Sequence, residues 1–327
     1  MLILAGDIGG TNTRIALFDA VSPTQFDTVR EEVFSSENFD GLEKILQQFL
    51  SHSTTERIGR ACLGIAGPVI DQVCDATNLP WRISAEEIRN RFEFDAVWLL
   101  NDLEANAWGI EALPDEDIYQ IAAGSGDAKG NRSIISAGTG LGEAGIYWDG
   151  NTYRPFPSEG GHSDFSPTTP MEFALYAWLS VQYDHVSWER VVSGPGLENL
   201  FRFLLQYREQ PTPEWVSRLK SSDDLAPAIS ETAMEGTDPV AVEALDLFLK
   251  LYGREAGNHA LKLMATGGVY LGGGLAPKVL SRLDRGDFLA AFLDKGRMRP
   301  LMESMPVRVI LNDKAALLGA ARFARLQ

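Results

Sequence analysis

The stretch GDIGGTNTRIALFD, residues 6–19, places one acidic side chain and several small polar residues between two apolar segments. The apolar run 2–5 predicts a buried strand, and the polar/apolar alternation over 14–18 predicts a second one. The loop therefore joins strand to strand. The dinucleotide fingerprint and the Walker phosphate loop both lead into a helix, and the Walker form ends in Gly-Lys-Ser/Thr, which is missing here. Both motifs are excluded.

A glycine hairpin can still bind an oxyanion through its backbone N–H groups, here with the hydroxyls of Thr11 and Thr13 beside them. Asp7 would lie next to that oxyanion. Two anions meet favourably only with a cation between them, for which Mg²⁺ is the best candidate. The alternative is an ordinary tight hairpin, because Gly and Asn are common turn residues. The loop alone leaves both interpretations open.

Two further glycine clusters follow the first. Residues 133–150, SIISAGTGLGEAGIYWDG, repeat the order strand, glycine-rich turn, strand, and residues 267–278, GGVYLGGGLAPK, predict a strand that leads into a helix. Three such clusters in one chain could hold a nucleotide from several sides. Their spacing resembles the actin-like ATPase superfamily, in which two related domains surround ATP.

Carboxylates, an amide and a histidine lie between and after these clusters. They are Asn101, Asp102, Glu159, His162 and Glu189. Carboxylates and amides suit pairs of adjacent hydroxyls, so the set predicts a site for a neutral, polyhydroxylated sugar. Each residue also has a structural alternative. Asn101 or Asp102 could cap a helix, His162 could be a structural histidine, and Glu189 could be a solvated carboxylate at a helix start.

The composition limits the class of protein. A chain of 327 residues suggests two domains. Its formal net charge of −16 argues against nucleic-acid and acidic-membrane partners, which require a basic surface. No uninterrupted apolar segment of about 18 residues occurs, so we expect neither a secretory signal nor a membrane span, and a cytoplasmic location. Cys62 and Cys74 are expected to be reduced thiols in or near strands.

Helix-period segments alternate with short apolar runs, which predicts an α/β protein. Helices are expected from Asp40, from Asp238 and after Asn312, and strands at 62–66, 97–100 and 307–311. The first helix would bury one face, made of Leu42, Ile45, Leu46 and Phe49. The polar segment 211–224 is interpreted as a surface loop.

Eight ordered blocks over nearly the whole chain resemble the bacterial glucokinase family, the hexokinase-like group of the actin-type ATPase superfamily. The blocks are GDIGGTNTRIALFD, NDLEANAWGI, SAGTGLGEAGI, PSEGGHSDFSP, ERVVSGPGLENL, GGVYLGGGLAPK, DKGR and NDKAALLGAARF. The resemblance implies a two-domain, actin/hexokinase-like (ribonuclease H-like) α/β fold with ATP and sugar in the interdomain cleft. The small domain would be 1–112 plus 313–327, and the large domain 113–312.

The resemblance also implies roles for individual residues. The ATP site would consist of Gly6, Asp7, Ile8, Gly9, Gly10, Thr11 and Asn12 with Gly138, Thr139 and Gly140 at the phosphates, and Gly273 and Gly274 by the adenosine. The sugar would be held by Asn101, Asp102, Glu159, His162 and Glu189. Asp102 would be the catalytic base, and Asp7 would reach Mg²⁺ through water.

The implied activity is ATP-dependent phosphorylation of D-glucose at its 6-hydroxyl, a step of glycolysis, by a homodimer. The repressor-type sugar kinases carry a cysteine-rich zinc motif after their Gly-His pair, and no cysteine follows His162, so zinc is not expected. Three alternatives stay open from the residues themselves. They are a kinase for another neutral hexose, an actin-like ATPase without a sugar acceptor, and an idle sugar-binding regulator.

Overall fold

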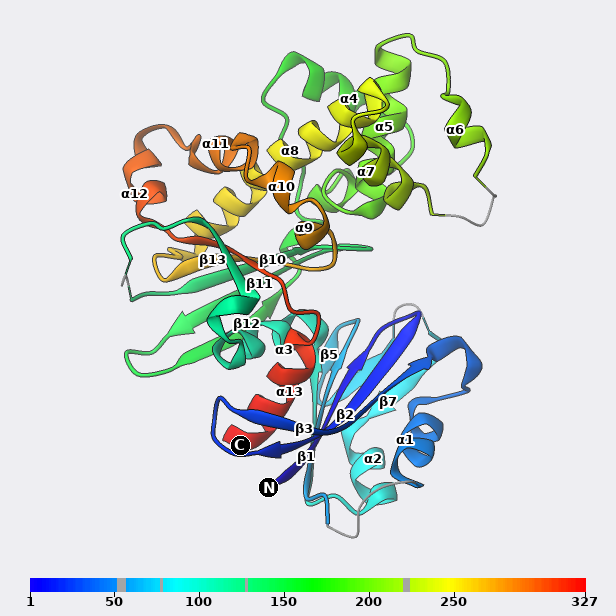
Figure 1. Ribbon diagram of the computed structural model, residues 1–327, viewed down its shortest axis with the longest axis vertical. Coiled ribbons are helices and arrows are strands. Elements are labelled where there is room, and N and C mark those ends of the chain that lie inside the picture. Colours follow the sequence, from blue (N-terminus) through cyan, green and yellow to red (C-terminus); the bar gives the residue numbers. More distant parts are fainter. Residues whose placement is uncertain (52–56, 77–78, 127–128, 220–223) are drawn as a thin grey trace. The chain divides into compact units, whose positions relative to one another are not determined.

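The computed structural model describes residues 1–51, 57–76, 79–126, 129–219 and 224–327, which form helices and three sheets (Figure 1). The chain divides into two compact units. Unit 1 comprises Met1–Ile118, Arg154–Pro157 and Asn312–Gln327, and unit 2 comprises Tyr119–Tyr153 and Ser158–Leu311. Within the described ranges, every helix is too short or too polar to cross a membrane.

Unit 1 is built on a five-stranded sheet with the order β3-β2-β1-β4-β8. Its strands are β1 Leu2–Ile8, β2 Asn12–Ala20, β3 Phe26–Ser35, β4 Arg60–Ile65 and β8 Ala96–Asn101. β1 pairs antiparallel with β2 and parallel with β4, and β4 is parallel to β8. The strands expected at 2–5, 14–18, 62–66 and 97–100 are thus confirmed. Each of them extends beyond the predicted range at one end or at both.

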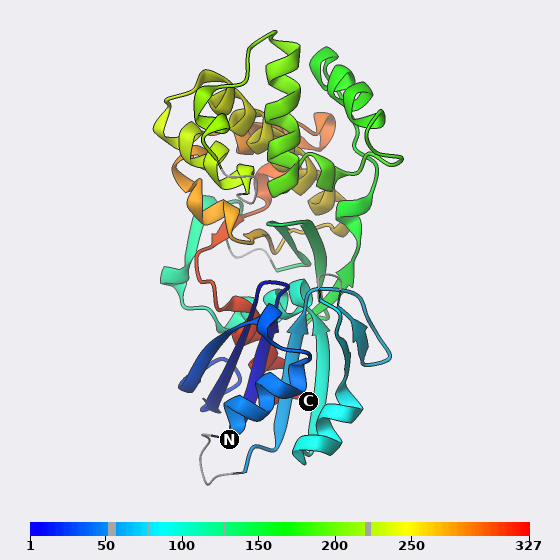
Figure 2. The ribbon, with the colours of Figure 1, turned by 90° about the vertical axis from the view of Figure 1, so that its right-hand side faces the viewer.

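Both faces of this sheet are buried. Alternate residues of a strand point to opposite faces, so each strand contributes to two apolar clusters. Leu2 and Leu4 pack in a cluster with helices α1 (Leu42–Ser51) and α2 (Ala85–Phe92), which cover one face (Figure 2). Ile3 and Ala5 pack in a second cluster with α3 (Asp102–Gly109) and α13 (Ala315–Leu326). The apolar residues expected to face the core from α1 are all buried: Leu42, Ile45, Leu46 and Phe49.

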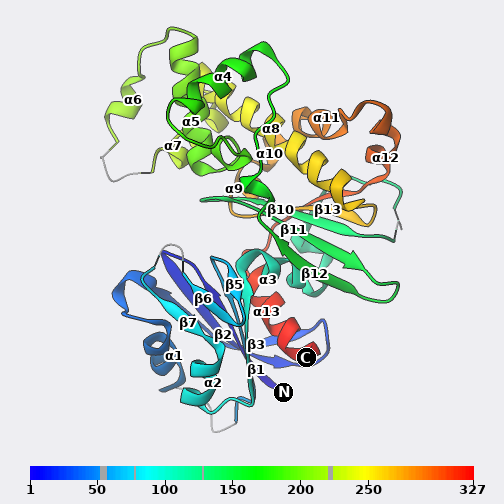
Figure 3. The ribbon, with the colours of Figure 1, turned by 180° about the vertical axis from the view of Figure 1, so that it is seen from behind.

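A small sheet completes the first of these clusters. Its strands are β5 Val69–Ile70, β6 Val73–Asp75 and β7 Arg82–Ser84 (Figure 3). Cys74 in β6 and Cys62 in β4 are buried free thiols, as expected from the sequence.

Helices α3 and α13 cross with their backbones in direct contact. A Cβ on Gly319 would collide with the carbonyl oxygen of Ala105, and one on Gly109 would collide with that of Ala315. Glycine is therefore required at both positions, since any side chain would force the helices apart. The last helix of the chain is in this way fixed to the helix that starts at Asp102.

Unit 2 is built on a six-stranded sheet with the order β12-β11-β10-β13-β14-β9. Its strands are β9 Ile118–Ala122, β10 Arg132–Ala137, β11 Leu141–Trp148, β12 Tyr153–Ser158, β13 Gly268–Gly272 and β14 Val307–Ile310. β10 pairs antiparallel with β11 and parallel with β13, and β13 is parallel to β14. These four strands match β1, β2, β4 and β8 of unit 1 in order and direction, so the two similar sequence segments occupy equivalent hairpins.

Helices lie on one side of the unit 2 sheet, some against its strands and others packed on those helices. The longer ones are α4 Pro170–Ser180, α5 Gly194–Tyr207, α7 Leu225–Glu235, α8 Pro239–Leu263 and α11 Asp287–Leu293; the shorter ones are α6 Glu214–Ser217, α9 Leu275–Lys278, α10 Leu280–Leu283 and α12 Arg299–Ser304. Short 3₁₀ turns are η1 Ser36–Asn38, η2 Ile110–Ala112, η3 Asp115–Asp117, η4 Gly160–His162, η5 Trp188–Arg190 and η6 Gly296–Met298. α8 begins after its predicted cap, Asp238, whose Oδ1 accepts hydrogen bonds from the N–H groups of Val240 and Ala241.

The sequence predicted a surface loop over 211–224, but α6 lies within this segment. Trp215 explains the difference. Its indole Nε1 donates to Oδ2 of Asp238 at 2.9 Å, and its ring packs against Phe201 at a centroid distance of 5.5 Å. Residues 220–223 lie outside the described residues.

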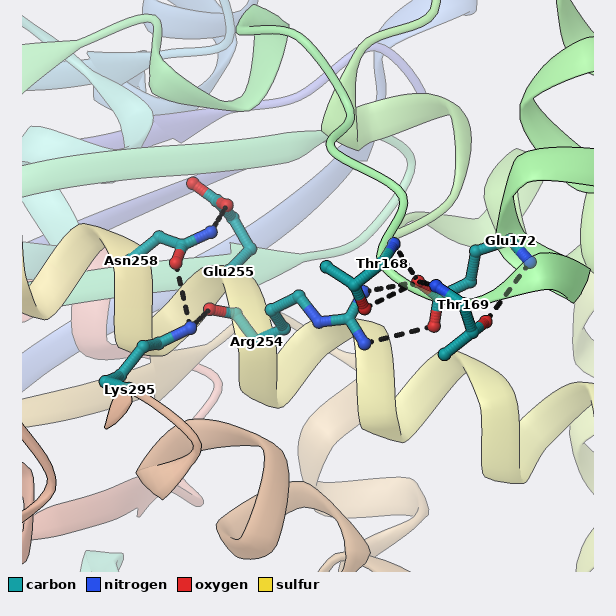
Figure 4. Close-up of polar contacts among 7 residues, drawn as sticks. All are labelled: Thr168, Thr169, Glu172, Arg254, Glu255, Asn258 and Lys295. Carbon is teal, nitrogen blue, oxygen red and sulfur yellow. Dashed lines mark hydrogen bonds and ion pairs between the residues drawn. The ribbon is translucent and has the colours of Figure 1, made fainter. Parts of the chain in front are cut away.

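A buried ion pair joins α8 to the start of α4 (Figure 4). Arg254 donates to both carboxylate oxygens of Glu172, at 2.7 and 3.0 Å. Glu172 also accepts from the N–H of Thr168 and completes a capping box with Thr169. Burial alone would raise the pKa of Glu172, but the hydrogen bonds from Arg254 and Thr168 lower it from 4.5 to about 2.

We predict that Glu172→Gln lowers the free energy of unfolding by about 3 kcal/mol at pH 7, because it leaves Arg254 buried without its counter-charge. A carboxyl group whose pKa is lowered by folding stabilises the fold fully when the pH is above its pKa in the unfolded chain. This contribution is lost as the pH falls through its pKa in the folded chain. The gap between variant and wild type should therefore narrow from pH 4.5 toward pH 2 in denaturant titrations. Glu198→Gln, which removes the more exposed pair with Arg202, is the control and should change stability by less than about 1 kcal/mol. A gap independent of pH would contradict the assignment.

Candidate active site

The first glycine hairpin joins β1 to β2 in unit 1. The N–H of Gly9 donates to the carbonyl oxygen of Asn12 at 2.9 Å and closes the turn. In the described part of the chain, the N–H groups of Gly10 and Thr11 at its tip make no hydrogen bond. These groups are therefore available to an anion.

Ser36 supports this hairpin from below, and sequence reasoning missed it. Its Oγ donates to the carbonyl oxygen of Gly9 at 2.9 Å, and its N–H donates to that of Thr11 at 2.9 Å. The hydroxyl of Thr13 is buried against Oγ of Ser36 at 2.9 Å. The expectation that the Thr13 hydroxyl faces an oxyanion is therefore wrong. No motif in the sequence marks Ser36, because its role depends on the pairing of β2 with β3.

Asp7 and Asp102 lie close together at the carboxyl ends of parallel strands. Asp7 is opposite Gly64 of β4, and a Cβ on Gly64 would lie 3.8 Å from Cα of Asp102. Burial first, and then the negative charge of Asp102, raise the pKa of Asp7 from 3.8 to about 6, while Arg14 acts in the opposite direction. Two carboxylates that repel each other in this way fit a divalent cation, whose preferred ligands are carboxylate oxygens and water.

The choice between Asn101 and Asp102 as the helix cap is resolved. Oδ1 of Asn101 accepts from the N–H groups of Leu103 and Glu104, and its Nδ2 donates to the carbonyl oxygen of Gly67. Asn101 is therefore the N-cap of α3. Asp102 is the first helical residue, and its Oδ1 also accepts from the N–H of Leu103 at 2.9 Å. A helix N-terminus favours an ionised carboxylate at this position.

The second glycine hairpin joins β10 to β11 in unit 2. The N–H of Gly138 donates to the carbonyl oxygen of Gly140 at 2.9 Å, with Thr139 exposed at the tip. The carbonyl oxygen of Gly138 accepts from the N–H of Gly194, the first residue of α5, at 2.7 Å. The hairpin is thus attached to the N-terminus of a long helix, where the helix dipole favours negative charge.

Glu189, predicted to hold sugar, lies directly against this hairpin. Its Oε2 accepts from the N–H of Leu141 at 3.0 Å, and a Cβ on Gly140 would lie 2.6 Å from the same oxygen. Gly140 is therefore needed for the carboxylate to approach. A residue of the predicted sugar set and a residue of the predicted phosphate set are in contact within unit 2.

The third glycine cluster lies beside the second hairpin. Gly273 follows β13, has a φ of +80°, and would place a Cβ 2.6 Å from the carbonyl oxygen of Ala137, the last residue of β10. Only glycine adopts this conformation at so short a distance. Gly273 and Gly274 are exposed, so their backbone can meet a ligand.

Glu159 is the residue before η4 of unit 2 and His162 is the last residue of this turn, and both are exposed. The N–H of His162 donates to the carbonyl oxygen of Glu159 at 3.1 Å. Nε2 of His185 lies 2.8 Å from the carbonyl oxygen of His162, which gives His185 a supporting role that sequence reasoning missed. The N–H of Trp188 donates to the carbonyl oxygen of Ser163 at 3.0 Å, and so ties this segment to the one that carries Glu189.

Each unit thus brings one part of the predicted set together. Unit 1 places the first hairpin, Asp7 and the Asn101–Asp102 pair at one edge of its sheet. Unit 2 places the second and third glycine clusters at the carboxyl ends of β10 and β13, and joins Glu189 to the second hairpin. In open α/β sheets this is the edge at which ligands bind. The glycine-rich backbone suits a phosphate group, and the carboxylates suit the hydroxyls of a polyhydroxylated acceptor.

Comparisons with known proteins show what this chain is similar to. A family model described as Glucokinase matches residues 4–327. The glucokinase of Synechocystis sp. is 42% identical over 341 residues, covering 97% of this chain and 96% of that protein. The solved glucokinase from an Antarctic psychrotroph has a TM-score of 0.87 and 31% identity, covering 100% of this chain and 99% of that one. A glucokinase of Balamuthia mandrillaris solved with glucose, at a TM-score of 0.80 and 24% identity over 99% of this chain and 93% of that one, shows likeness of fold alone.

Because its pKa is raised from 3.8 to about 6, ionised Asp7 destabilises the folded chain at neutral pH when no cation is bound. We predict that Asp7→Asn increases the free energy of unfolding by about 2 kcal/mol at pH 7. The gain should shrink as pH falls through 6 and vanish below about 3.8, where the acid is protonated in both states. Denaturant titrations in EDTA measure it. Asp27→Asn, an exposed carboxyl of the same unit, is the control, and an equal gain there would show a general effect of net charge.

Proposed function

The chain belongs to the glucokinase family, and from that premise we propose that it transfers the terminal phosphoryl group of ATP to the 6-hydroxyl of D-glucose. It is a phosphotransferase with an alcohol group as acceptor, and its fold is the two-domain, hexokinase-like α/β fold that the eight sequence blocks predicted. The observation that carries the proposal is the contact of Glu189 with the second glycine hairpin, where a group suited to sugar hydroxyls meets a backbone suited to phosphate.

Asp102 is proposed as the catalytic base. Phosphoryl transfer has a loose transition state, so the protein mainly orients the acceptor and neutralises charge on the transferred group. Asp102 at the first turn of α3 would accept the proton of the 6-hydroxyl. Its hydrogen bond from Leu103 and its place at a helix N-terminus favour the ionised form that this role needs.

The backbone amides of both hairpins are proposed to hold the ATP phosphates in place of a Walker lysine. Gly6, Asp7, Ile8, Gly9, Gly10, Thr11 and Asn12 would serve in unit 1, and Gly138, Thr139 and Gly140 in unit 2, with Gly273 and Gly274 by the adenosine. Asp7 would hold Mg²⁺ through water, and when bound the ion would neutralise phosphate charge. The repulsion between Asp7 and Asp102 supports a cation there.

Glucose is proposed to be held by Asn101, Asp102, Glu159, His162 and Glu189. Carboxylate and amide oxygens accept hydrogen bonds from its hydroxyls. Since Asn101 already caps α3 through its Oδ1 and donates to Gly67 through Nδ2, its contribution would come from the second proton of that amide. A pure ATPase would not need this set.

We also propose that the protein acts in the cytoplasm as a homodimer, with domains 1–112 plus 313–327 and 113–312. The family resemblance supports the dimer. Exposed apolar side chains on and next to α4 and α5 would suit such a contact: Phe173, Tyr176, Val181 and Tyr207. Because the proposed sugar ligands come from both domains, glucose binding is expected to bring them together and exclude water from the reaction.

We predict that Asp102→Asn lowers kcat by about 10² to 10⁴-fold and changes the Kd for glucose much less, because it keeps the shape but removes the proton acceptor. Asn101 caps α3, so the substitution leaves the cap in place and the thermal midpoint nearly unchanged. A coupled assay and glucose titrations test this. Near-normal kcat in the folded variant would remove Asp102 from the mechanism.

We predict that gluconate and glucose 6-phosphate are not phosphorylated. A further negative charge beside Glu159 and Glu189 is unfavourable by Coulomb repulsion in a site that excludes water. A panel of hexoses and anionic sugars with ATP measures this and also compares glucose with fructose, mannose and N-acetylglucosamine. Comparable turnover of gluconate and glucose would contradict the assigned sugar site.

A further inference from the structure

Glu143 and His259 form a buried polar pair in unit 2 that the proposed reaction does not use. Glu143 lies on β11 and His259 on α8, with side chains 1% and 5% exposed. Nδ1 of His259 lies 3.1 Å from Oε2 of Glu143, and Nε2 lies 3.1 Å from the carbonyl oxygen of Ala144. A carbonyl oxygen only accepts, so Nε2 of His259 carries a proton and Nδ1 faces the carboxyl group of Glu143.

The carboxyl group of Glu143 lies directly under η4. A Cβ on Gly160 would collide with its Oε2, and a Cβ on Gly161 would collide with the carbonyl oxygen of Leu141. Oγ of Ser158 donates to the backbone carbonyl oxygen of Glu143 at 2.8 Å. The turn therefore rests on β11 with no space between them, and the position of the carboxyl group determines where the backbone of Gly160 can lie.

Glu159 and His162 are the two ends of this turn. Gly160 and Gly161 are the residues between them, so a shift of Gly160 away from β11 would move both side chains. The carbonyl oxygen of Gly160 also accepts from the N–H and Oγ of Ser163, which makes the turn a compact unit that moves as a whole.

We propose that the buried Glu143–His259 pair helps to position glucose, because it fixes the distance between β11 and the turn that carries Glu159 and His162. This inference rests on the proposed function. Neither residue touches the sugar, and both act through Gly160. The pair sets the geometry in which the hydroxyls of glucose are recognised.

The same helix holds the other end of this segment. Arg254, on α8 close to His259, clamps Glu172 and the residues before it (Figure 4). Lys295, the residue before η6, donates to the carbonyl oxygen of Arg254 and to Oδ1 of Asn258, and Nδ2 of Asn258 donates to Oε2 of Glu255. The segment from Glu159 to Glu172 is thus anchored to α8 at both ends. Its start is held through Glu143 and His259, and its end by Arg254.

Stability alone does not account for the pair. Both carboxylate oxygens of Glu143 are buried without a hydrogen-bond partner among the described residues, and so is Oε1 of Glu255. The charge of Glu143 adds to burial in raising the pKa of Glu255 to about 7, so the carboxyl group of Glu143 also disfavours ionisation of its neighbour. An apolar side chain at position 143 would avoid these costs. The pair provides instead a rigid support of fixed shape under the turn.

The test uses the full-length enzyme with Glu143→Ala, Gly160→Ala and the double variant. Removing the carboxyl group or adding a methyl group above it should each raise the KM for glucose about tenfold or more, with the KM for ATP within about twofold of wild type. In the double variant the added methyl group occupies the space that the carboxyl group left. Its glucose KM should therefore be lower than the product of the two single effects.

Asp246→Ala is the matched control, because it breaks another ion pair of α8, with Arg282, that does not touch the turn. Its glucose KM should stay within about twofold of wild type. Should Glu143→Ala fail to fold, Gly160→Ala, which keeps the pair intact, decides by the same measure. Glucose titrations followed by tryptophan fluorescence give the Kd independently of turnover.

Three results would overturn the inference. One is a glucose KM within about twofold of wild type in the folded Gly160→Ala variant, another is strictly multiplicative effects in the double variant, and the third is an equal rise in Asp246→Ala. In each case wild-type turnover of glucose would still leave the proposed function standing. If wild type does not phosphorylate glucose but phosphorylates another hexose, the proposed substrate is wrong, and the same variants are then measured on that hexose.

Discussion

The close approach of backbone segments at the strand ends is the constraint on which the proposed site residues of each unit depend. In unit 2 the backbone after β13 lies so near the end of β10 that a Cβ on Gly273 would be 2.6 Å from the carbonyl oxygen of Ala137. In unit 1 a Cβ on Gly64 would be 2.9 Å from Cβ of Ala105, beneath Asp102. A side chain would push β13 away from β10 at the first position and α3 away from β4 at the second, and the backbone amides or carboxylates of that unit would shift.

Much of this framework could be predicted from the sequence, because its signals are local. Alternating apolar residues indicated β2, the face of α1 followed a helical period, and the Asp238-Pro239 start of α8 was confirmed by its cap. The glycine hairpins were recognisable because two of them repeat the same order of elements. The predicted α/β class follows from that alternation.

The supporting contacts could not be predicted, because they join residues far apart in the chain. Ser36 braces a hairpin from 27 residues beyond Gly9, and Arg254 clamps Glu172 from 82 residues away. The Thr13 hydroxyl looked like a ligand group until the pairing of β2 with β3 placed it against Ser36. Likewise nothing local assigns the cap of α3 to Asn101 and not to Asp102. Sequence spacing identifies residues that could meet a ligand, whereas the residues that hold them in place are defined by tertiary packing.

The crossing of α3 with α13 has a consequence for how the chain is made. The core that contains Ile3 and Ala5 is completed by Ala316, Leu317, Ala320, Ala321 and Ala324, which lie close to the last residue. During synthesis from the N-terminus, one face of the unit 1 sheet therefore stays uncovered until α13 has left the ribosome. Unit 2, which lies between these segments in sequence, has all its strands from β10 to β14 available earlier. The apolar face that carries Ile3 and Ala5 thus stays uncovered until after the unit 2 strands have been synthesised, and until then it needs protection from other chains.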